Sequence, residues 1–526
     1  MVACADDVCR YETACQPGGA DGAHGGIRCV GARHGERGLA GLICSCGAPW
    51  PGYALIEAPG VSPGRAGGFE LELATVHIQW ASRRGAHACM NEKFPIDGSR
   101  DALWMVTAPP APSVDPYTGS STADVAIVGG GLTGLNAALE LSRHGVSVTV
   151  LEAASIGFGA SGRAGGQVNL GLNAGPSELL QRFGDGQGRR LIELVLDTPQ
   201  TVFDLVKEHD LQCDAVQNGW VQAAANSAIW KSQRAMADDY NVHRSVLSVL
   251  DADELALRSG AHGYAGGLFC ESAGSVQPLA YTRELARVSL ARGVRIHDRS
   301  AVTGIDHAGK QWRLSTDQGE LLANKVLICT NGYTQADVKG PHKGLSSRVV
   351  PVRSVLAATA PLSDNLRKSI LPNEVTFVDK RRLILYMRYD RDGRLCVGDH
   401  GPTRDGFRLD DFTAVKRRAL AVFPQLEGVG WDYHWGGRLA MTKSGLPFMH
   451  EVAPGLIAGM GFNGRGVGMG TMMGRELARY VVNEDSESTG FPLSSPKTFL
   501  MHRFHRAGVN MAVKWYALQD HLEQYR

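Results

Sequence analysis

The stretch DVAIVGGGLTGLNAALELSRHGVSVTVLEA, residues 124–153, restricts the fold of this 526-residue chain more than any other. Its apolar run at 125–128 is typical of a buried parallel strand, and its later leucines and alanines repeat at helical spacing. The pattern predicts a strand at 124–128, a helix at about 132–144 that ends at Gly145, and a strand at 146–151. These three elements form a βαβ unit, which predicts an α/β fold with a parallel sheet.

Gly129, Gly131 and Gly134 supply the pattern G-x-G-x-x-G at the turn between the first strand and the helix. The first glycine makes the tight turn, the second lets a pyrophosphate approach the backbone, and the third lets helix and strand pack closely. Glu152 follows about 20 residues on, where a carboxylate accepts both ribose hydroxyls and repels a 2′-phosphate. The fingerprint predicts a dinucleotide other than NADP and leaves FAD and NAD open.

Two glycine-rich loops need a separate explanation. SIGFGASGRAGGQV, residues 155–168, contains five glycines, and residues 459–470 contain six. Glycine-rich backbone at a helix start is a typical anion site. There is no second fingerprint for a nicotinamide nucleotide, and NAD at 129–134 would leave the loop at 459–470 without a role.

Four motifs carry a family resemblance when they are read in chain order after Glu152. The chain resembles the D-amino-acid oxidase/glycine oxidase superfamily of FAD enzymes, nearest the bacterial γ-glutamylputrescine oxidase and L-pipecolate oxidase branch. The resemblance covers roughly residues 100–525. The motifs are GFGASGRAGGQV (157–168), CTNGYT (329–334), WGGRLAMTKSGLPFM (435–449) and GFNGRGVGMGTMMGRELA (461–478).

The resemblance implies a discontinuous Rossmann-like FAD-binding domain, of the glutathione-reductase-like type, and a mixed β-sheet and helical substrate domain. It also implies that Val302 contacts adenine through its backbone. The loop at 464–468 would cover the pyrimidine end of the flavin and lead into a helix whose N-terminus stabilises negative charge. The residues implied to contact FAD in the two loops are Ser161, Gly162, Arg163, Gly165, Gly166, Gln167, Gly464, Arg465, Gly466, Val467 and Gly468.

Three positions depart from the relatives. Gly468 stands where sarcosine-oxidase-like members have a lysine that binds the substrate carboxylate, so this contact is either absent or supplied by Arg388, Arg163 or Arg465. The flavin-linking cysteine of those members aligns near Leu439, which implies noncovalent FAD. Ala164 replaces the asparagine of the usual S-G-R-N-G-G motif and leaves the substrate class open.

Candidate catalytic residues are Tyr386, Arg388 and Arg465. Tyr386 and Arg388 fall on a predicted strand, where alternation sends both side chains to the same face. His400, in the turn-like run 398–401, is interpreted as structural, and Trp435 as either a wall of the flavin pocket or a core residue.

The predicted domains are discontinuous. Residues 122–175, 266–338 and 431–483 form the FAD-binding domain, and residues 176–265 and 339–430 form the substrate domain. An arm at 90–121 precedes them, and a tail with a terminal helix at 484–526 follows, its aromatic and leucine side chains docking on the protein itself.

Residues 1–89 contain seven of the eleven cysteines but no hydrophobic periodicity. We interpret them as unstructured or as translated sequence ahead of a true start at Met90; a small metal module is the alternative. Asp6, Asp7 and Glu12 interrupt any secretory signal.

Composition narrows the class of protein. The 54 Lys and Arg nearly balance the 53 Asp and Glu, which argues against a nucleic-acid partner. No apolar run reaches the roughly 18 residues of a transmembrane segment, and the 17 histidines show no metal-ligand spacing. We therefore predict a cytoplasmic protein without a metal.

The resemblance implies oxidation of the C–N bond of a small primary or secondary amine or amino acid to an imine, by hydride transfer to flavin N5. The substrate would be γ-glutamylputrescine-like or pipecolate-like, and the electron acceptor O₂ or a quinone. The alternatives are a flavin-dependent RNA- or protein-modifying factor, or a noncatalytic FAD-binding protein on the same scaffold.

Overall fold

The computed structural model describes residues 102–335, 338–404 and 406–523, together with four strands nearer the N-terminus. These four strands pair in sequence order as an antiparallel sheet within the unit Met1–Arg83. The sequence predicts an unstructured segment here, because it shows no hydrophobic periodicity. Antiparallel neighbours pair through their backbone groups, so the four strands need no such apolar pattern. Whether residues 1–89 belong to the native protein stays a prediction, and the expected start at Met90 lies outside the described residues. The strands are β1 (Val8–Tyr11), β2 (Ile27–Arg33), β3 (Ala40–Cys46) and β4 (Tyr53–Ile56).

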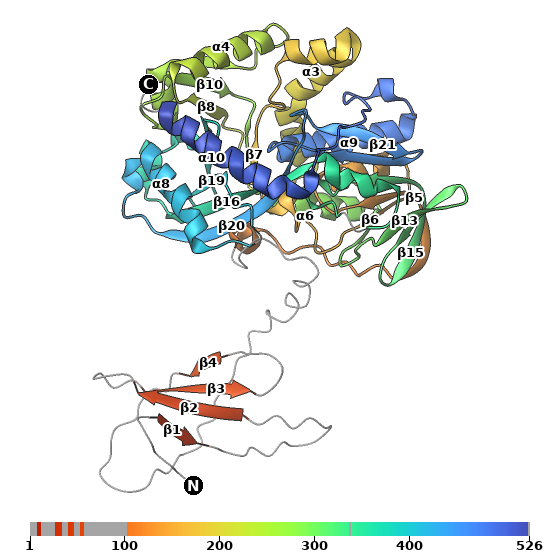
Figure 1. Ribbon diagram of the computed structural model, residues 1–526, viewed down its shortest axis with the longest axis horizontal. Coiled ribbons are helices and arrows are strands. Elements are labelled where there is room, and N and C mark those ends of the chain that lie inside the picture. The colour runs from red at the N-terminus through yellow and green to blue at the C-terminus, as the bar shows by residue number, and fades with distance from the viewer. Residues whose placement is uncertain are drawn as a thin grey trace. The chain divides into compact units, whose positions relative to one another are not determined.

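In the unit Arg84–Arg526, the fingerprint strand β5 lies inside a largely parallel sheet (Figure 1). β5 pairs with β6 and β15, β6 pairs with β12, and the carboxyl end of β15 pairs with β22, all in parallel. Strands from three separated parts of the chain thus build one sheet, and the predicted discontinuous Rossmann-like fold is confirmed. β13 and β14 extend it as an antiparallel hairpin. The strands are β5 (Gly119–Val128), β6 (Val148–Leu151), β12 (Arg295–His297), β13 (Gly304–Ala308), β14 (Gln311–Ser315), β15 (Gly319–Ile328), β21 (Phe448–Ala453) and β22 (Leu456–Met460).

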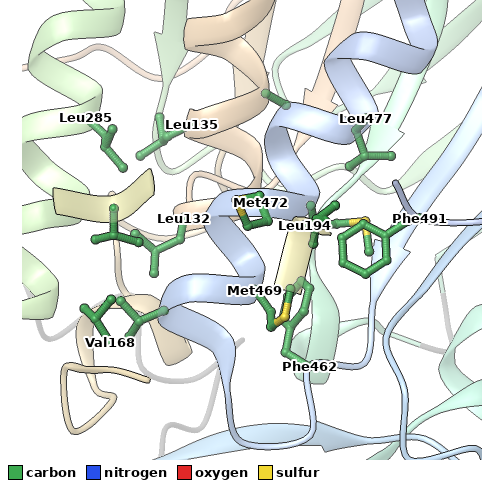
Figure 2. Packing of buried hydrophobic residues seen from close by; sticks show 14 of the residues in the cluster. Leu132, Leu135, Val168, Leu194, Leu285, Phe462, Met469, Met472, Leu477 and Phe491 are labelled. Carbon is green, nitrogen blue, oxygen red and sulfur yellow. The ribbon is translucent and has the colours of Figure 1, made fainter. Parts of the chain in front are cut away.

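Helix α2 (Leu132–Arg143) begins directly after the glycine turn and packs against both α6 (Pro278–Ala291) and α9 (Gly466–Asn483). Figure 2 shows Leu132 and Leu135 of α2 among apolar side chains that include Met469 and Met472 of α9. This packing joins the first βαβ unit to the C-terminal strand–loop–helix segment. The two glycine turns that precede α2 and α9 therefore lie on one rigid framework.

A second, mixed sheet has the strand order β20-β16-β19-β18-β17-β8-β10-β9, in which only β17 and β8 pair in parallel. β10 and β20 belong to this sheet, whereas the predicted boundaries place their residues in the FAD-binding domain. The predicted boundary is wrong for β20 because this strand pairs along the length of β16. A local sequence pattern does not identify such a distant partner. The strands are β8 (Trp220–Ala224), β9 (Ser248–Leu250), β10 (Gly266–Cys270), β16 (Val350–Pro361), β17 (Thr376–Lys380), β18 (Leu385–Tyr389), β19 (Arg394–His400) and β20 (Trp431–Met441).

The remaining elements connect the two sheets or cover them. β7 (Gln167–Val168) and β11 (Gly274–Ser275) form a short antiparallel ribbon. No helix of the described residues is long and apolar enough to cross a membrane. The other helices are α1 (Leu103–Thr107), α3 (Pro176–Glu208), α4 (Ser227–Asn241), α5 (Ala252–Ser259), α7 (Asp364–Ser369), α8 (Thr413–Val422) and α10 (His505–Glu523).

Candidate functional site

A cavity of about 1390 Å³ lies where the carboxyl ends of β5, β6 and β15 meet one face of the second sheet. Pockets for drug-sized ligands occupy about 300–1,000 Å³, so this cavity has room for a dinucleotide together with a small substrate. The motif CTNGYT and both glycine-rich loops line it. The structure therefore brings together segments that lie more than 300 residues apart in the sequence.

The fingerprint turn forms the anion-binding end of the cavity. Gly129 has φ +113°, and a Cβ on Gly131 would lie 2.7 Å from Oγ of Ser161. The Leu132 N–H, at the start of α2, donates to that same Oγ at 3.0 Å. The positive end of a helix and a backbone without Cβ atoms fit the diphosphate of FAD.

Glu152 lies beside this turn at the end of β6. Its Oε2 accepts from the Gly130 N–H at 2.7 Å and its Oε1 from the Ala154 N–H at 2.9 Å. Burial raises the pKa of the Glu152 carboxyl above its usual value. Val302 also lines this end. Both residues thus occupy positions that fit the adenosine half of FAD.

Two tryptophans outside the cavity hold the backbone of the loop at 163–164. Trp104 Nε1 donates to the Ala164 carbonyl at 2.9 Å, and Trp435 Nε1 donates to the Arg163 carbonyl at 3.1 Å. Trp435 is fully buried and does not line the cavity, so the alternative of a core residue is the correct one. The Arg163 side chain donates to the carbonyls of Phe158 and Gly436.

The end of the same loop is attached to the second sheet. Gly166 has φ +79°, and a Cβ there would lie 2.2 Å from the Val276 carbonyl oxygen. Gln167 Nε2 donates to the Met387 carbonyl at 2.9 Å. Gly165, Gly166 and Gln167 all line the cavity, and the loop forms a fixed wall between the two sheets.

The C-terminal glycine loop brings Gly464, Arg465, Gly466 and Val467 to the cavity at the start of α9. The Arg465 guanidinium donates to the Leu170 carbonyl and to Oδ1 of Asn173. It also lies 5.5 Å from the centre of the Trp220 ring. These contacts fix Arg465 as part of the wall.

Three predicted cofactor-binding glycines do not line the cavity. A Cβ on Gly134 would lie 2.1 Å from the Gly129 carbonyl oxygen, and one on Gly162 would lie 2.1 Å from that of Gly157. A Cβ on Gly468 would lie 2.4 Å from Cγ2 of Thr198 in α3. Each therefore permits close backbone packing behind the site. Thr198 occupies the space that a side chain at Gly468 would need, so this chain has no room for a lysine at that position.

Tyr386 and Arg388 lie on one face of β18 as predicted, yet only Tyr386 reaches the cavity. Its hydroxyl lies 3.0 Å from Oγ of Ser354, and burial raises its pKa to about 12. Arg388 is only 3% exposed and lines a separate cavity of about 160 Å³, with its guanidinium 4.8 Å from the Trp104 ring. Trp104 and the loop around Gly166 lie over Arg388, so its predicted place in the active site is wrong.

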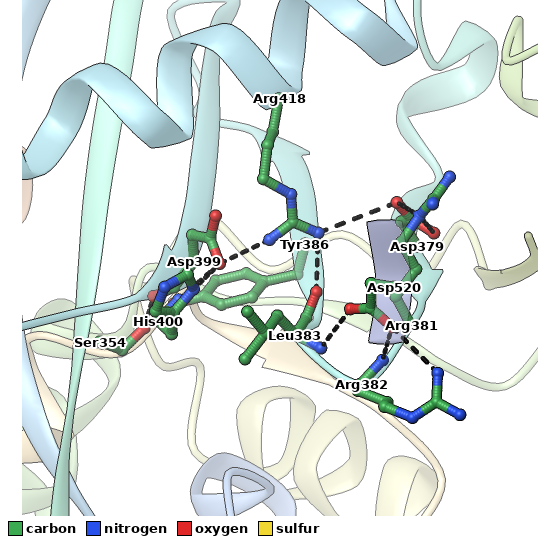
Figure 3. A network of polar contacts seen from close by, with 10 residues as sticks. All are labelled: Ser354, Asp379, Arg381, Arg382, Leu383, Tyr386, Asp399, His400, Arg418 and Asp520. Carbon is green, nitrogen blue, oxygen red and sulfur yellow. Dashed lines mark hydrogen bonds and ion pairs between the residues drawn. The ribbon is translucent and has the colours of Figure 1, made fainter. Parts of the chain in front are cut away.

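Sequence reasoning missed His400. Strand β19 continues through this residue, so the predicted turn is wrong, and its imidazole lines the cavity. His400 Nδ1 lies 2.7 Å from Oδ1 of Asp399, which also accepts from Nη1 of Arg418 at 2.7 Å (Figure 3). Because an ionised carboxylate only accepts, Nδ1 carries the hydrogen and Nε2 of the neutral ring is an acceptor. The adjacent Asp399 was the sequence feature that could have indicated a functional role for His400. The glycines around this pair favoured the prediction of a turn instead.

Lys380 was also missed. It ends β17 and lines the cavity, and its ammonium has no hydrogen-bond or ion-pair partner among the described residues. Burial, reinforced by the positive charge of Arg465, lowers the pKa of its ammonium to about 8. In the sequence, Lys380 alternates with Val378, another cavity residue. Every strand shows such alternation, so it does not identify Lys380 as a binding residue.

Helix α10 forms the remaining wall. His505, Val509, Ala512, Val513 and Tyr516 line the cavity from this helix. Near its end, Asp520 accepts from the Leu383 N–H at 3.1 Å and the Arg382 N–H at 3.3 Å (Figure 3). The terminal helix that the sequence predicts is thus attached to the turn between β17 and β18.

Comparison with known proteins gives consistent matches. A family model described as DAO, FAD dependent oxidoreductase, matches residues 124–480. The chain is 30% identical over 415 residues to a probable oxidoreductase OrdL of Haemophilus influenzae, covering 77% of this chain and 94% of that protein. It is 29% identical over 411 residues to a gamma-glutamylputrescine oxidoreductase of Escherichia coli, covering 78% and 95%.

Solved structures show the same fold. Glycine oxidase from Geobacillus kaustophilus superposes with a TM-score of 0.61 at 21% identity, covering 72% of this chain and 99% of that one. L-amino acid deaminase from Proteus myxofaciens gives a TM-score of 0.60 at 18% identity, covering 78% and 98%.

Proposed function

The chain belongs to the DAO family of FAD-dependent oxidoreductases, and we propose that it oxidises the C–N bond of a small primary or secondary amine or amino acid to an imine. The observation that carries the proposal is one continuous cavity, from the dinucleotide fingerprint to the face of the second sheet. The similarity to a gamma-glutamylputrescine oxidoreductase supports a substrate of that kind, and pipecolate remains the other candidate class. FAD, when bound, supplies the acceptor for the hydride equivalent.

We assign FAD binding to the predicted residues that line the cavity, and noncovalent attachment stays part of the proposal. Gly129 and Gly131 leave space for the diphosphate, and Glu152 accepts the ribose hydroxyls. The loops on either side of the cavity enclose the rest of the cofactor. Their residues in this assignment are Ser161, Arg163, Gly165, Gly166, Gln167, Gly464, Arg465, Gly466 and Val467, with Val302 at the adenine end.

The charges around the cavity support a substrate that carries a carboxylate. Two acidic residues line it, Glu152 and Asp399, against six lysines and arginines. Arg163 and Arg465 already donate to backbone carbonyls, whereas Lys380 has no partner among the described residues. We therefore assign the substrate carboxylate to Lys380, in place of the three arginines that the sequence suggested. The six basic residues are Arg163, Arg353, Lys380, Arg382, Arg438 and Arg465.

On the amine side, His400 is positioned to accept a proton. Asp399 orients its ring and leaves Nε2 as an acceptor, and His400 lines the cavity. A substrate ammonium that transfers its proton to Nε2 becomes the neutral amine, the form from which a hydride can leave. Tyr386, neutral because of its raised pKa, forms part of the same wall. A cytoplasmic location and O₂ or a quinone as electron acceptor complete the proposal.

The test begins with the flavin spectrum of the purified protein. Anaerobic addition of γ-glutamylputrescine, pipecolate, sarcosine, or D- and L-amino acids should bleach the bound flavin with at least one substrate. Free FAD with the same compounds is the control. If FAD binds but no amine bleaches it, the amine-oxidising function is wrong and a noncatalytic FAD-binding protein becomes the better explanation.

A further inference from the structure

Arg388 carries a buried charge that the proposed reaction does not use. It is 3% exposed, and its guanidinium forms no hydrogen bond or ion pair with the described residues. Burial lowers the pKa of this guanidinium, yet an arginine in a protein stays protonated. The protein therefore holds a full positive charge at this position, and salt screens a buried charge only weakly.

The acidic residues near Arg388 are engaged elsewhere. Asp390 and Asp214 favour the charged form of the guanidinium from a distance, but neither forms an ion pair with it. All three acidic residues on the small cavity beside Arg388 are paired with other arginines. The pairs are Asp214 with Arg391, Glu374 with Arg367, and Asp390 with Arg394. The charge of Arg388 is thus available to act on other groups nearby.

The backbone of one loop lies between this guanidinium and the cofactor cavity. A Cβ on Gly166 would lie 3.4 Å from Cζ of Arg388. Gly166 itself lines the cavity, whereas Arg388 does not. FAD bound against Gly165, Gly166 and Gln167 would therefore have a positive charge behind the loop that it contacts.

Trp104 fixes the position of both the charge and the loop. Its ring centre lies 4.8 Å from Cζ of Arg388, a cation–π contact, and its Nε1 donates to the Ala164 carbonyl at 2.9 Å. The ring packs edge-on against Trp435, whose Nε1 donates to the Arg163 carbonyl, with 5.4 Å between the two ring centres. One buried aromatic pair thus holds the guanidinium and the loop together.

The charge of Arg388 bears on the reduction of FAD. A hydride equivalent brings two electrons and one proton, so the reduced ring carries one more negative charge than the oxidised ring. A fixed positive charge in a water-excluded site stabilises negative charge that develops nearby. We propose that Arg388 raises the reduction potential of bound FAD through its charge, acting across the loop 164–167, and that Trp104 is its positioning residue. The inference rests on the proposed placement of FAD along this loop and is independent of the amine that the protein oxidises.

The test is the reduction potential of the full-length, FAD-loaded protein, measured anaerobically against a reference dye with no amine present. A unit charge that acts over about 10 Å, at an effective dielectric constant of about 20, changes an equilibrium about tenfold. Arg388→Met should therefore lower the ratio of reduced to oxidised flavin at a given potential about tenfold, which is a fall of about 30 mV for two electrons. Arg388→Lys keeps the charge and should keep the native potential.

Two further variants separate the charge from packing. Trp104→Phe keeps an aromatic ring beside the guanidinium but removes the N–H donor to the loop. FAD should then bind about two- to tenfold more weakly, as titration of the apoprotein measures. The matched control is Arg258→Met, which removes an exposed arginine of α5 that also lies over an aromatic ring, that of Phe269. This variant should leave the potential unchanged.

The outcomes decide between charge and structure. A potential that falls in the neutral variant alone supports the proposal. An unchanged potential in Arg388→Met overturns it, and so does an equal fall in Arg388→Lys, because packing would then be responsible. Arg388→Gln repeats the measurement if Arg388→Met does not retain FAD. Loss of FAD from both neutral variants, with FAD retained by Arg388→Lys, also overturns the proposal and assigns the charge to cofactor binding. An unchanged FAD affinity in Trp104→Phe removes Trp104 from its positioning role.

Discussion

Replacing Lys380 by methionine tests the proposed substrate site most directly. The side chain keeps nearly its length and loses its charge, so the wall of the cavity should remain intact. A hydrogen bond to a charged group contributes about 1.5–3 kcal/mol. At 1.4 kcal/mol for each factor of ten, KM for a carboxylate-bearing amine should rise about 10- to 140-fold.

The pH dependence gives a second measurement on the same residue. Because the pKa of Lys380 is about 8, its ammonium is charged below that pH and neutral above it. In the native protein, KM for a carboxylate-bearing substrate should be low below pH 8 and rise as the pH increases through it. In Lys380→Met this dependence should disappear.

Steady-state kinetics with two amines separate binding from general damage. An analogue that lacks the carboxylate should show the same KM in Lys380→Met and in the native protein. Lys368→Met, which changes an exposed lysine on α7, is the control. An unchanged KM for the carboxylate substrate, or an equal increase for both amines, would refute the assignment.

Three further changes test other parts of the site. Glu152→Gln should weaken FAD binding about tenfold or more, because a charged acceptor for the ribose hydroxyls is lost; titration with FAD measures it, and an unchanged Kd would contradict the assignment. Gly134→Ala should lower stability by about 1–3 kcal/mol, since its Cβ would lie 2.1 Å from a backbone oxygen; thermal unfolding measures the loss, and an unaltered Tm would show that the turn relaxes. His400→Asn should slow anaerobic flavin reduction about 100-fold at neutral pH. This defect should shrink at high pH, where the amine is already neutral, and a defect independent of pH would exclude His400 as the proton acceptor.

The local elements of the fold were predictable because neighbouring residues alone specify them. The strand, glycine turn and helix around Gly129 form from a short apolar run, a backbone without Cβ atoms and a helical repeat. The predicted helix at 132–144 matches α2 (Leu132–Arg143), and the predicted strand at 124–128 lies within β5. Glu152 and the two glycine-rich loops reach the cavity for the same reason, since each immediately adjoins a regular element.

The errors concern residues whose role depends on what covers them. Alternation correctly placed Tyr386 and Arg388 on one face of β18, but it cannot show that Trp104, from a distant helix, lies over the Arg388 guanidinium. Gly468 directly follows Gly464–Val467, which line the cavity, and only the packing of α3 shows that Gly468 serves helix contact.

The sequence by itself thus determined that this chain has a Rossmann-like sheet, a dinucleotide fingerprint and the glycine loops of its family, because these follow from contacts between residues close in sequence. The tertiary structure decided which side chains meet in the cavity, because strand register and helix packing join segments hundreds of residues apart. Lys380, His400 and the inner face of α10 enter the site only through such long-range contacts.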